Sequence, residues 1–259
     1  MKAILLGSGT SGGVPRIGND WGACDPGNPR NRRSRVSVVI EHDDKRILVD
    51  TSPDLRNQLL DNDIDALDAV IWTHDHADHS HGIDDLRPLF HRSRKALPGY
   101  GKSYAIDSLA TRFDYVFAGG DGYPPIVARN VLTDDQVIAG IQVRSVDQPH
   151  GPVLSTGLRF DIGTQSIVYA TDFSAITNDM RKLYQGCDLL IVDCLRPEPH
   201  PTHAHLAMAL AFAEECSAKH TVLTHMDKSL DYADLSRALP AGIEPGYDGL
   251  VIDLAEAFA

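Results

Sequence analysis

The stretch THDHADHSHG, residues 73–82, places four of the chain's 12 histidines and two of its aspartates within ten residues. It follows Ala-Val-Ile-Trp, residues 69–72, an apolar run that predicts a buried strand. The cluster therefore lies where a strand ends and before the next helix begins. Imidazole and carboxylate groups are common ligands of divalent metals, so the stretch predicts a metal site at the end of a strand.

The spacing within the stretch predicts which side chains converge. Residues two apart in an extended chain point the same way, so His74 and His76 can meet at one point. Asp78 and His79 come at the expected start of the following helix and can turn toward a second point nearby. Asp75 is expected to point away from the site, and His81 to lie on the helix face or behind the ligands.

Three more residues occupy equivalent places: His150 after IQVRSV, Asp172 at the end of SIVYAT, and His225 at the end of TVLT. Strand ends gather at one edge of an α/β sheet, where such folds place their sites. The donor set has no thiolate, which favours Zn, Mn or Fe over copper. We expect two divalent ions, Zn or Mn, with His74, His76 and His150 on the first, Asp78, His79 and His225 on the second, and Asp172 bridging them.

The remaining pattern predicts one domain, residues 1–259, of layered α/β class with at least one mixed sheet. The segment 98–125, rich in Gly and aromatic residues, is expected to be an insertion or a lid. The predicted strands are residues 2–6, 36–41, 46–50, 69–73, 136–146, 158–161, 166–171, 188–193, 221–224 and 250–254. The predicted helices are residues 54–60, 79–90, 108–117, 178–184, 203–217 and 232–239.

Composition narrows the class of protein. A net charge of −12 argues against general affinity for nucleic acid, so no stable nucleic-acid partner is expected. No apolar run approaches the roughly 18 residues of a membrane span, and four scattered cysteines favour a reduced, cytoplasmic protein. The basic clusters at 30–35 and 87–95 are either solvated surface or face an anionic substrate.

GSGTSG, residues 7–12, matches the G-x-G-x-x-G pattern of dinucleotide binding. That pattern must open a helix, yet Gly13, Pro15 and Gly18 follow directly. We therefore expect no nucleotide site in this loop.

THDHADH, followed by His150, Asp172 and His225, closely resembles the metallo-β-lactamase superfamily over nearly the whole chain. The resemblance implies a four-layer αβ/βα sandwich with a dinuclear site at one edge. His79, directly after the motif's aspartate, is a feature shared with glyoxalase II, the tRNA 3′-end endonucleases and the cyclic-phosphodiester phosphodiesterase of the carbon-phosphorus lyase pathway.

Within these hydrolases, His203 in PHPTHAHLAMAL resembles a catalytic histidine of the two phosphodiester-cleaving groups. A non-ligand imidazole beside two cations can hold a phosphoryl oxygen or protonate a leaving alkoxide. His200 and His205 are rivals for this role. The motifs W-G-x-C, VDCLRP and G-[FY]-D-G are similar to motifs of the carbon-phosphorus lyase phosphodiesterases. This resemblance also implies a homodimer. The resemblance also implies that relatives in this group can hold a structural zinc through clustered cysteines after the first loop. Here Cys24 stands alone, and Lys228 occupies the place where the extra histidine of those relatives would sit. We therefore expect no structural zinc.

The resulting hypothesis is hydrolysis of a small, cyclic, phosphoribosyl-type phosphodiester by a hydroxide bridging two ions about 3.5 to 4 Å apart. Asp78 would also orient the hydroxide, His203 would assist the leaving oxygen, and Asp50 would accept a hydrogen bond from a ligand histidine or else cap a turn. The alternatives are a tRNA 3′-end endonuclease-like nuclease, a thioester or lactone hydrolase with no need for His203, and a non-catalytic metal-binding protein whose site is closed to water or lacks a ligand.

Overall fold

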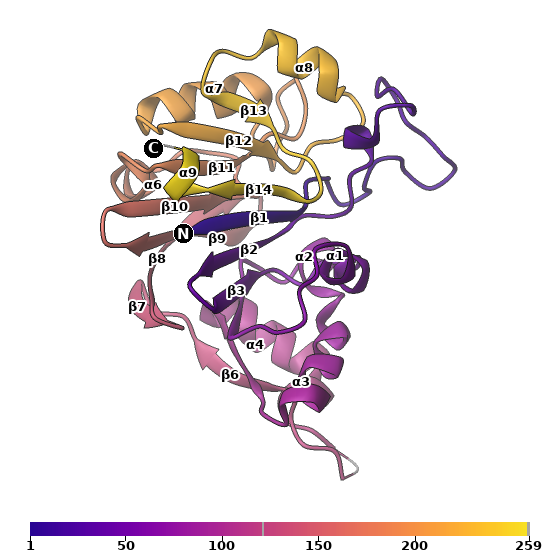
Figure 1. The fold of residues 1–259 in the computed structure, drawn as a ribbon, viewed down its shortest axis with the longest axis vertical. Helices are drawn as coiled ribbons and strands as arrows, with labels where there is room; N and C mark the ends of the chain where they lie inside the picture. The colour runs from indigo at the N-terminus through magenta and orange to yellow at the C-terminus, as the bar shows by residue number, and fades with distance from the viewer. Residues whose placement is uncertain (121, 258–259) are drawn as a thin grey trace.

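The computed structural model describes residues 1–120 and 122–257, which form two seven-stranded sheets packed face to face (Figure 1). The first sheet has the order β14 (Leu250–Asp253), β1 (Lys2–Gly7), β2 (Ser37–His42), β3 (Lys45–Val49), β4 (Ala69–Trp72), β5 (Leu97–Gly101) and β6 (Val127–Val131). The second has the order β13 (Ile243–Pro245), β12 (His220–Thr224), β11 (Leu189–Asp193), β10 (Gln165–Ala170), β9 (Val153–Ile162), β8 (Ile141–His150) and β7 (Asp135–Ile138).

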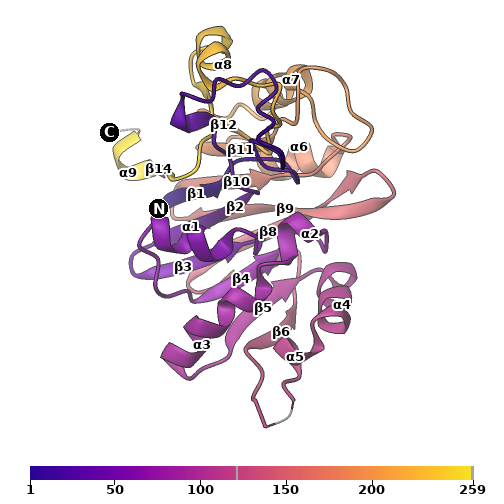
Figure 2. The ribbon, with the colours of Figure 1, turned by 90° about the vertical axis from the view of Figure 1, so that its right-hand side faces the viewer.

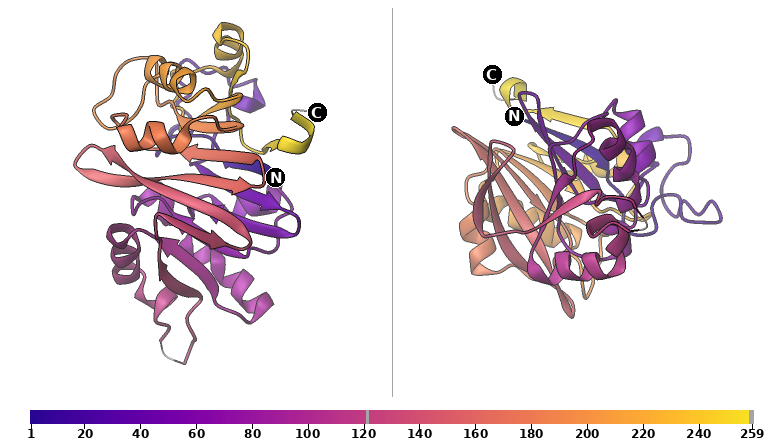
Figure 3. Two further views of the ribbon diagram at one scale, coloured as in Figure 1. Left: turned by 90° about the vertical axis from the view of Figure 1, so that its left-hand side faces the viewer. Right: turned by 90° about the horizontal axis from the view of Figure 1, so that it is seen from below.

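The central strands, such as β4, β10, β11 and β12, are buried on both faces, which explains their continuous apolar sequences. In β2, Val38 and Ile40 enter the core between the sheets, whereas Val39 faces the helices of the first sheet. Helices cover both outer faces and give four layers (Figure 3). Those on the first sheet are α1 (Leu55–Asp61), α2 (Ala77–Ser80), η2 (Ile83–Leu86), α3 (Arg87–Ser93), α4 (Ser103–Arg112) and α5 (Asp114–Phe117). Those on the second are α6 (Asn178–Tyr184), α7 (Leu206–Glu215) and α8 (Tyr232–Ala238), while η1 (Pro29–Asn31) and α9 (Leu254–Ala257) are short turns outside these layers.

The two sheets repeat one pairing pattern. In the first, β14, β1, β2 and β3 pair antiparallel, and β3 to β6 pair parallel. In the second, β7 to β10 pair antiparallel, and β10 to β13 pair parallel. Strand β3 therefore corresponds to β10, and β4 corresponds to β11. This repeat places the ends of equivalent strands at the same edge of the sandwich.

Several predicted elements were wrong in detail. The strand expected at 136–146 is the hairpin β7–β8, because Ala139 and Gly140 both have positive φ. The helix expected at 79–90 breaks into α2, η2 and α3 at Gly82, where a Cβ atom would collide with the carbonyl oxygen of Ser52. The helix expected at 203–217 begins only at Leu206.

The segment 98–125 is neither an insertion nor a lid, because it supplies most of β5 together with α4 and α5, which cover the first sheet. The strand LPGYG was not predicted, because it contains Pro and Gly, which are uncommon within strands. A Cβ atom at Gly99 would collide with Val127 and Trp72, so packing requires glycine there. Strands β6 and β13 and the short α9 were also missed. No helix in the described part of the chain combines the length and hydropathy of a membrane span.

Candidate metal centre

The site lies at the edge where the central strands end (Figure 2). The THDHADHSHG stretch follows β4, His150 ends β8, and Asp172 and His225 follow β10 and β12. Asp172 and His225 both have φ of 58°, a left-handed conformation that turns the chain sharply out of the strand. The structure brings all seven predicted ligands into one cluster.

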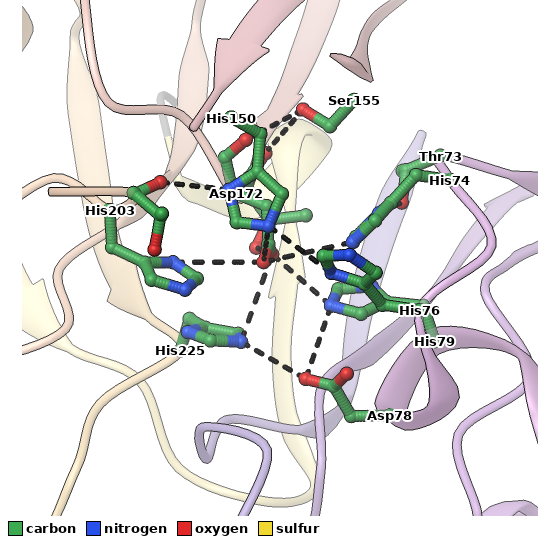
Figure 4. A network of polar contacts seen from close by, with 12 residues as sticks. Thr73, His74, His76, Asp78, His79, His150, Ser155, Asp172, His203 and His225 are labelled. Atoms are coloured by element: carbon green, nitrogen blue, oxygen red, sulfur yellow. Dashed lines mark hydrogen bonds and ion pairs between the residues drawn. The ribbon is translucent and has the colours of Figure 1, made fainter. Parts of the chain in front are cut away.

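His74, His76 and His150 form the first group. One ring nitrogen of each lies within 4.8 Å of the others. Nδ1 of His76 is 3.3 Å from Nε2 of His150, so these two atoms face one another (Figure 4). His76 is exposed while the other two are buried, which gives this group one side open to solvent.

Asp78, His79 and His225 form the second group, with the same 4.8 Å limit between their ligand atoms. Oδ2 of Asp78 lies 3.5 Å from Nε2 of His79 and 3.5 Å from Nε2 of His225. Both imidazoles are buried, and the aspartate retains 13% side-chain exposure. Asp78 therefore lies between the buried interior of the site and the solvent.

Asp172 lies between the groups, with one oxygen toward each. Its Oδ1 is 3.5 Å from Nε2 of His150 and 3.9 Å from Nε2 of His74. Its Oδ2 is 3.2 Å from Nε2 of His79 and 3.7 Å from Nε2 of His225. This is the placement that a bridging carboxylate requires.

The residues fit divalent metal binding on a structural criterion. Nε2 of His74 and Nε2 of His79 are both buried and have no hydrogen-bond partner. Buried polar atoms are normally satisfied, so converging orphaned nitrogens around a carboxylate indicate an electrophile between them. Imidazole nitrogens with carboxylate oxygens are ligands that divalent transition metals accept.

The electrostatics of the metal-free site divide the donors into two kinds. Burial alone would lower the pKa of His79 and His225, but Asp172 and Asp78 raise the pKa of His79 well above its usual value and that of His225 to about 9. Burial lowers the pKa of His74 well below its usual value, which favours the neutral imidazole. Burial alone would raise the pKa of Asp172, but His225 and His79 hold it well below its usual value. The site therefore contains a neutral imidazole at His74 and an ionised carboxylate at Asp172, whereas His79 and His225 would release protons on binding a metal.

A second layer of contacts orients the rings. Nδ1 of His79 lies 2.7 Å from Oδ2 of Asp50, which confirms the expected contact between Asp50 and a histidine of the motif. Oγ1 of Thr73 donates to Asp50 and lies 3.0 Å from Nδ1 of His74. Nδ1 of His150 donates to the carbonyl oxygen of Thr202 at 2.8 Å. With Nδ1 occupied in all three rings, the Nε2 lone pairs are directed into the site.

Asp193, at the end of β11, was not predicted. Its buried Oδ2 is 3.1 Å from Nδ1 of His203 and accepts the backbone N–H of Ala204 at 3.2 Å. The ring of His203 stacks on that of His225 with 4.7 Å between centroids, and 13% of its side chain is exposed (Figure 4). One feature of the sequence could have indicated Asp193. The apolar strand LLIVD ends in this aspartate, just as the run ILVD ends in Asp50.

The other histidines of the two motifs have separate surroundings. Nε2 of His81 is 2.8 Å from the guanidinium of Arg112 on α4, behind the motif. Asp75 points away from the cluster as expected, because Ser108 donates to its Oδ2 at 2.6 Å. Nδ1 of His200 accepts the backbone N–H of Thr202 at 3.3 Å, and its ring centroid is 5.3 Å from that of His203. His205 only precedes α7 at its N-terminus, without a side-chain capping bond.

The glycine-rich loop uses its backbone internally. The N–H of Gly9 donates to the carbonyl oxygen of Ser34 at 2.8 Å and that of Thr10 to Met226 at 3.2 Å. The next regular element is only the short η1, so no helix opens behind the loop. The loop therefore does not lead into the helix that the dinucleotide-binding pattern requires, and the absence of a nucleotide site stays a prediction.

The first basic cluster, residues 30–35, also makes mostly internal contacts. Arg33 is buried, and its guanidinium donates to the carbonyl oxygens of Asp227 and Leu230 and contacts the sulfur of Cys24. Arg35 pairs with Asp54 at 3.0 Å. In the second cluster, Arg87 and Arg92 pair with Asp84 and Asp65, respectively. That the chain lacks a structural zinc beside Cys24 stays a prediction.

The family model described as "Beta-lactamase superfamily domain" matches residues 45–226. The chain belongs to the metallo-β-lactamase superfamily. A solved diphosphatase from the PhnP family is 37% identical, with a TM-score of 0.88 over 98% of this chain and 97% of that one. The family and this relative identify the chain as a metal-dependent hydrolase domain.

Two further relatives extend the comparison. An octanoyltransferase of Porphyromonas gingivalis is 35% identical over an alignment of 257 positions, which covers 96% of this chain but only 51% of that protein. The chain thus spans about half the length of this relative. The Zn²⁺-bound PqqB of Methylobacterium extorquens is 18% identical, with a TM-score of 0.79 over 98% of this chain and 100% of that one, and shows the shared fold.

Proposed function

We propose that this chain hydrolyses a small phosphodiester, of the cyclic phosphoribosyl type, with the aid of two divalent ions, Zn or Mn. The observation that carries the proposal is His203, held by a buried carboxylate beside two groups of metal-type donors. Hydrolysis of a carbonyl substrate has no special need for this imidazole. Expulsion of an alkoxide from phosphorus does need a proton donor.

The proposed ligands follow the two groups of the site. His74, His76 and His150 would hold one ion, Asp78, His79 and His225 the other, with Asp172 shared. When bound, such ions neutralise charge on the phosphoryl oxygens and lower the pKa of coordinated water. The zinc-bound relative supports metal binding by the fold, and the number and identity of the ions belong to the proposal.

The protein's own groups supply the proton steps. Asp193 occupies Nδ1 of His203, so Nε2 is the atom left to hold a proton and deliver it to the leaving oxygen. The partly exposed carboxylate of Asp78 accepts a hydrogen bond from the attacking water and orients it. A net charge of −12 and an arginine cluster committed to internal contacts disfavour a long nucleic-acid substrate.

A diphosphate is the second candidate for the scissile group, because the 37% identical relative is described as a diphosphatase. Attack at phosphorus and protonation of a leaving oxygen would use the same residues. The homodimer implied by the family resemblance is part of this proposal and is tested by the mass of the protein in solution.

The test is turnover by protein whose metal content has been counted after loading with Mn or Zn. The substrates are 5-phosphoribosyl 1,2-cyclic phosphate, a dinucleoside diphosphate, bis(p-nitrophenyl) phosphate and a thioester. Fastest turnover of the cyclic diester, lost in His203→Ala, supports the proposal. Preference for the diphosphate would change the substrate class, and thioester turnover that survives His203→Ala would overturn the proposal. No turnover at two ions per chain would favour a non-catalytic protein.

A further inference from the structure

Two buried serines occupy equivalent places in the two sheets. Continuing the β2–β3 register by one residue places Ser37 opposite Asp50. Continuing the β9–β10 register places Ser155 opposite Asp172. Because β2 and β3 correspond to β9 and β10 in the repeated pairing pattern, each serine faces the site aspartate of its own sheet.

Each serine makes the same contact. The hydroxyl of Ser37 donates to the carbonyl oxygen of Asp50 at 2.9 Å, and that of Ser155 donates to the carbonyl oxygen of Asp172 at 2.7 Å. Both serines have 0% exposure. Figure 4 shows Ser155 beside the Asp172 turn.

Both aspartates need this contact for the same reason. Asp50 has φ of 64° and Asp172 has φ of 58°, so each leaves its strand in a left-handed conformation that non-glycine residues rarely adopt. The turn takes the carbonyl oxygen out of the strand ladder. A buried carbonyl must find another donor, and the opposing serine hydroxyl supplies it.

Further hydrogen bonds, from Gln148 and Tyr184, stabilise the contact between Ser155 and Asp172. Nε2 of Gln148 donates to Oγ of Ser155 at 3.0 Å and to the carbonyl oxygen of Thr171 at 2.8 Å. The hydroxyl of Tyr184 on α6 donates to Oε1 of Gln148 at 2.8 Å. The three side chains, of Ser155, Gln148 and Tyr184, are fully buried. The chain of hydrogen bonds thus runs from the outer helix layer to the backbone of the proposed bridging aspartate.

We infer that Ser155 and Ser37 are positioning residues that lock the backbone of Asp172 and Asp50 so that their carboxylates face the metal centre. Ser155 acts on the bridging carboxylate, and Ser37 acts through Asp50 on the ring of His79. The inference rests on the proposed metal centre and adds to it two residues that contact neither ion nor substrate.

The experiment measures Zn²⁺ affinity by competition with a chelator, together with the melting temperature of the metal-free protein. Ser155→Ala and Ser37→Ala are compared with Ser145→Ala. Ser145 is the matched control because it is a buried serine on β8 whose hydroxyl donates to the carbonyl oxygen of Thr133 at 3.1 Å, away from the site. All three variants lose a hydrogen bond from a serine hydroxyl to a backbone carbonyl, although the bond of Ser145 is only partly buried. Ser155→Ala also removes the acceptor of Nε2 of Gln148.

We expect a lower melting temperature in all three variants, but a rise of about tenfold or more in the Zn²⁺ dissociation constant only in Ser155→Ala and Ser37→Ala. A changed visible spectrum of the Co²⁺-loaded forms should accompany it. Unchanged affinity and spectrum in both variants would overturn the inference alone, whereas a wild-type chain that binds no metal would overturn the proposed function as well. If an alanine variant does not fold, the corresponding Ser→Cys variant, which keeps the volume and weakens the donor, gives the same comparison.

Discussion

Nδ1 of His203 lies 3.1 Å from Oδ2 of Asp193, a carboxylate with 0% exposure. The buried acceptor fixes the ring orientation and occupies Nδ1, which also lies 3.6 Å from Oδ1 of Asp172, so a proton to be donated would sit on Nε2. The same carboxylate lies 3.8 Å from Nδ1 of His225 through its other oxygen. One aspartate thus connects a proposed ligand with the proposed proton donor.

Asp193→Asn should slow catalysis in a way that depends on the leaving group. The amide cannot hold the imidazolium form of His203, so turnover of the cyclic diester should fall by about 100-fold or more. Turnover of bis(p-nitrophenyl) phosphate should change far less, because p-nitrophenolate leaves without a proton. The measurement is kcat for both substrates at equal, counted metal content. Equal losses on both would contradict a role in leaving-group protonation.

Asp172→Ala should lose one or both ions. Its two oxygens face the two donor groups separately, so removing them leaves each group one ligand short. Metal per chain, counted after dialysis, checks this. Asp75→Ala is the control from the motif itself, because the Asp75 carboxylate contacts Ser108 of α4 and should not affect metal content. Two ions retained with full activity in Asp172→Ala would rule out the bridging role.

Asp50→Asn should weaken metal binding about 10- to 100-fold without removing any ligand. The carboxylate accepts from Nδ1 of His79 and from the backbone N–H of Thr73 at 2.8 Å, and an amide presents only one acceptor to these two donors. Competition with a chelator measures the change. An affinity equal to that of the wild type would show that the His79 ring is oriented by other contacts.

Asp248 should give the metal-free protein a distinctive pH dependence of stability. It accepts from the N–H and hydroxyl groups of Ser8 and Ser34, yet the cost of burial outweighs these bonds and raises its pKa to about 6. The carboxyl group of Asp248 has a higher pKa in the folded state than in the unfolded chain, so between these two values the folded state binds more protons. The stabilisation that Asp248 contributes is therefore complete at low pH and declines as pH rises toward 6. The total decline is at most about 3 kcal/mol.

The measurement is the free energy of unfolding of wild type and Asp248→Asn from pH 4 to pH 7 in a chelator. The advantage of the wild type over the variant should shrink as pH rises through this range, since asparagine does not titrate. A difference that is constant with pH would show that the carboxyl group is not shifted.

The local pattern of the chain was sufficient for the motif and for most strands. His74 and His76 follow an apolar strand at a spacing of two, and such short-range features depend only on neighbouring residues. The fold class followed from the resemblance that these residues carry. The strand at Leu97–Gly101 was not predictable, because its Gly99 is required by Trp72 and Val127, which are distant in sequence.

The supporting residues depended on tertiary structure for the same reason. Asp193, Ser155 and Ser37 are ordinary residues at strand ends, and only the pairing of strands places them against His203, Asp172 and Asp50. The residue types alone establish which donor groups the chain offers, because ligand chemistry belongs to the side chains. Only the packing of the two sheets decided how those donors converge, because register and left-handed turns at the strand ends arise from contacts between distant segments.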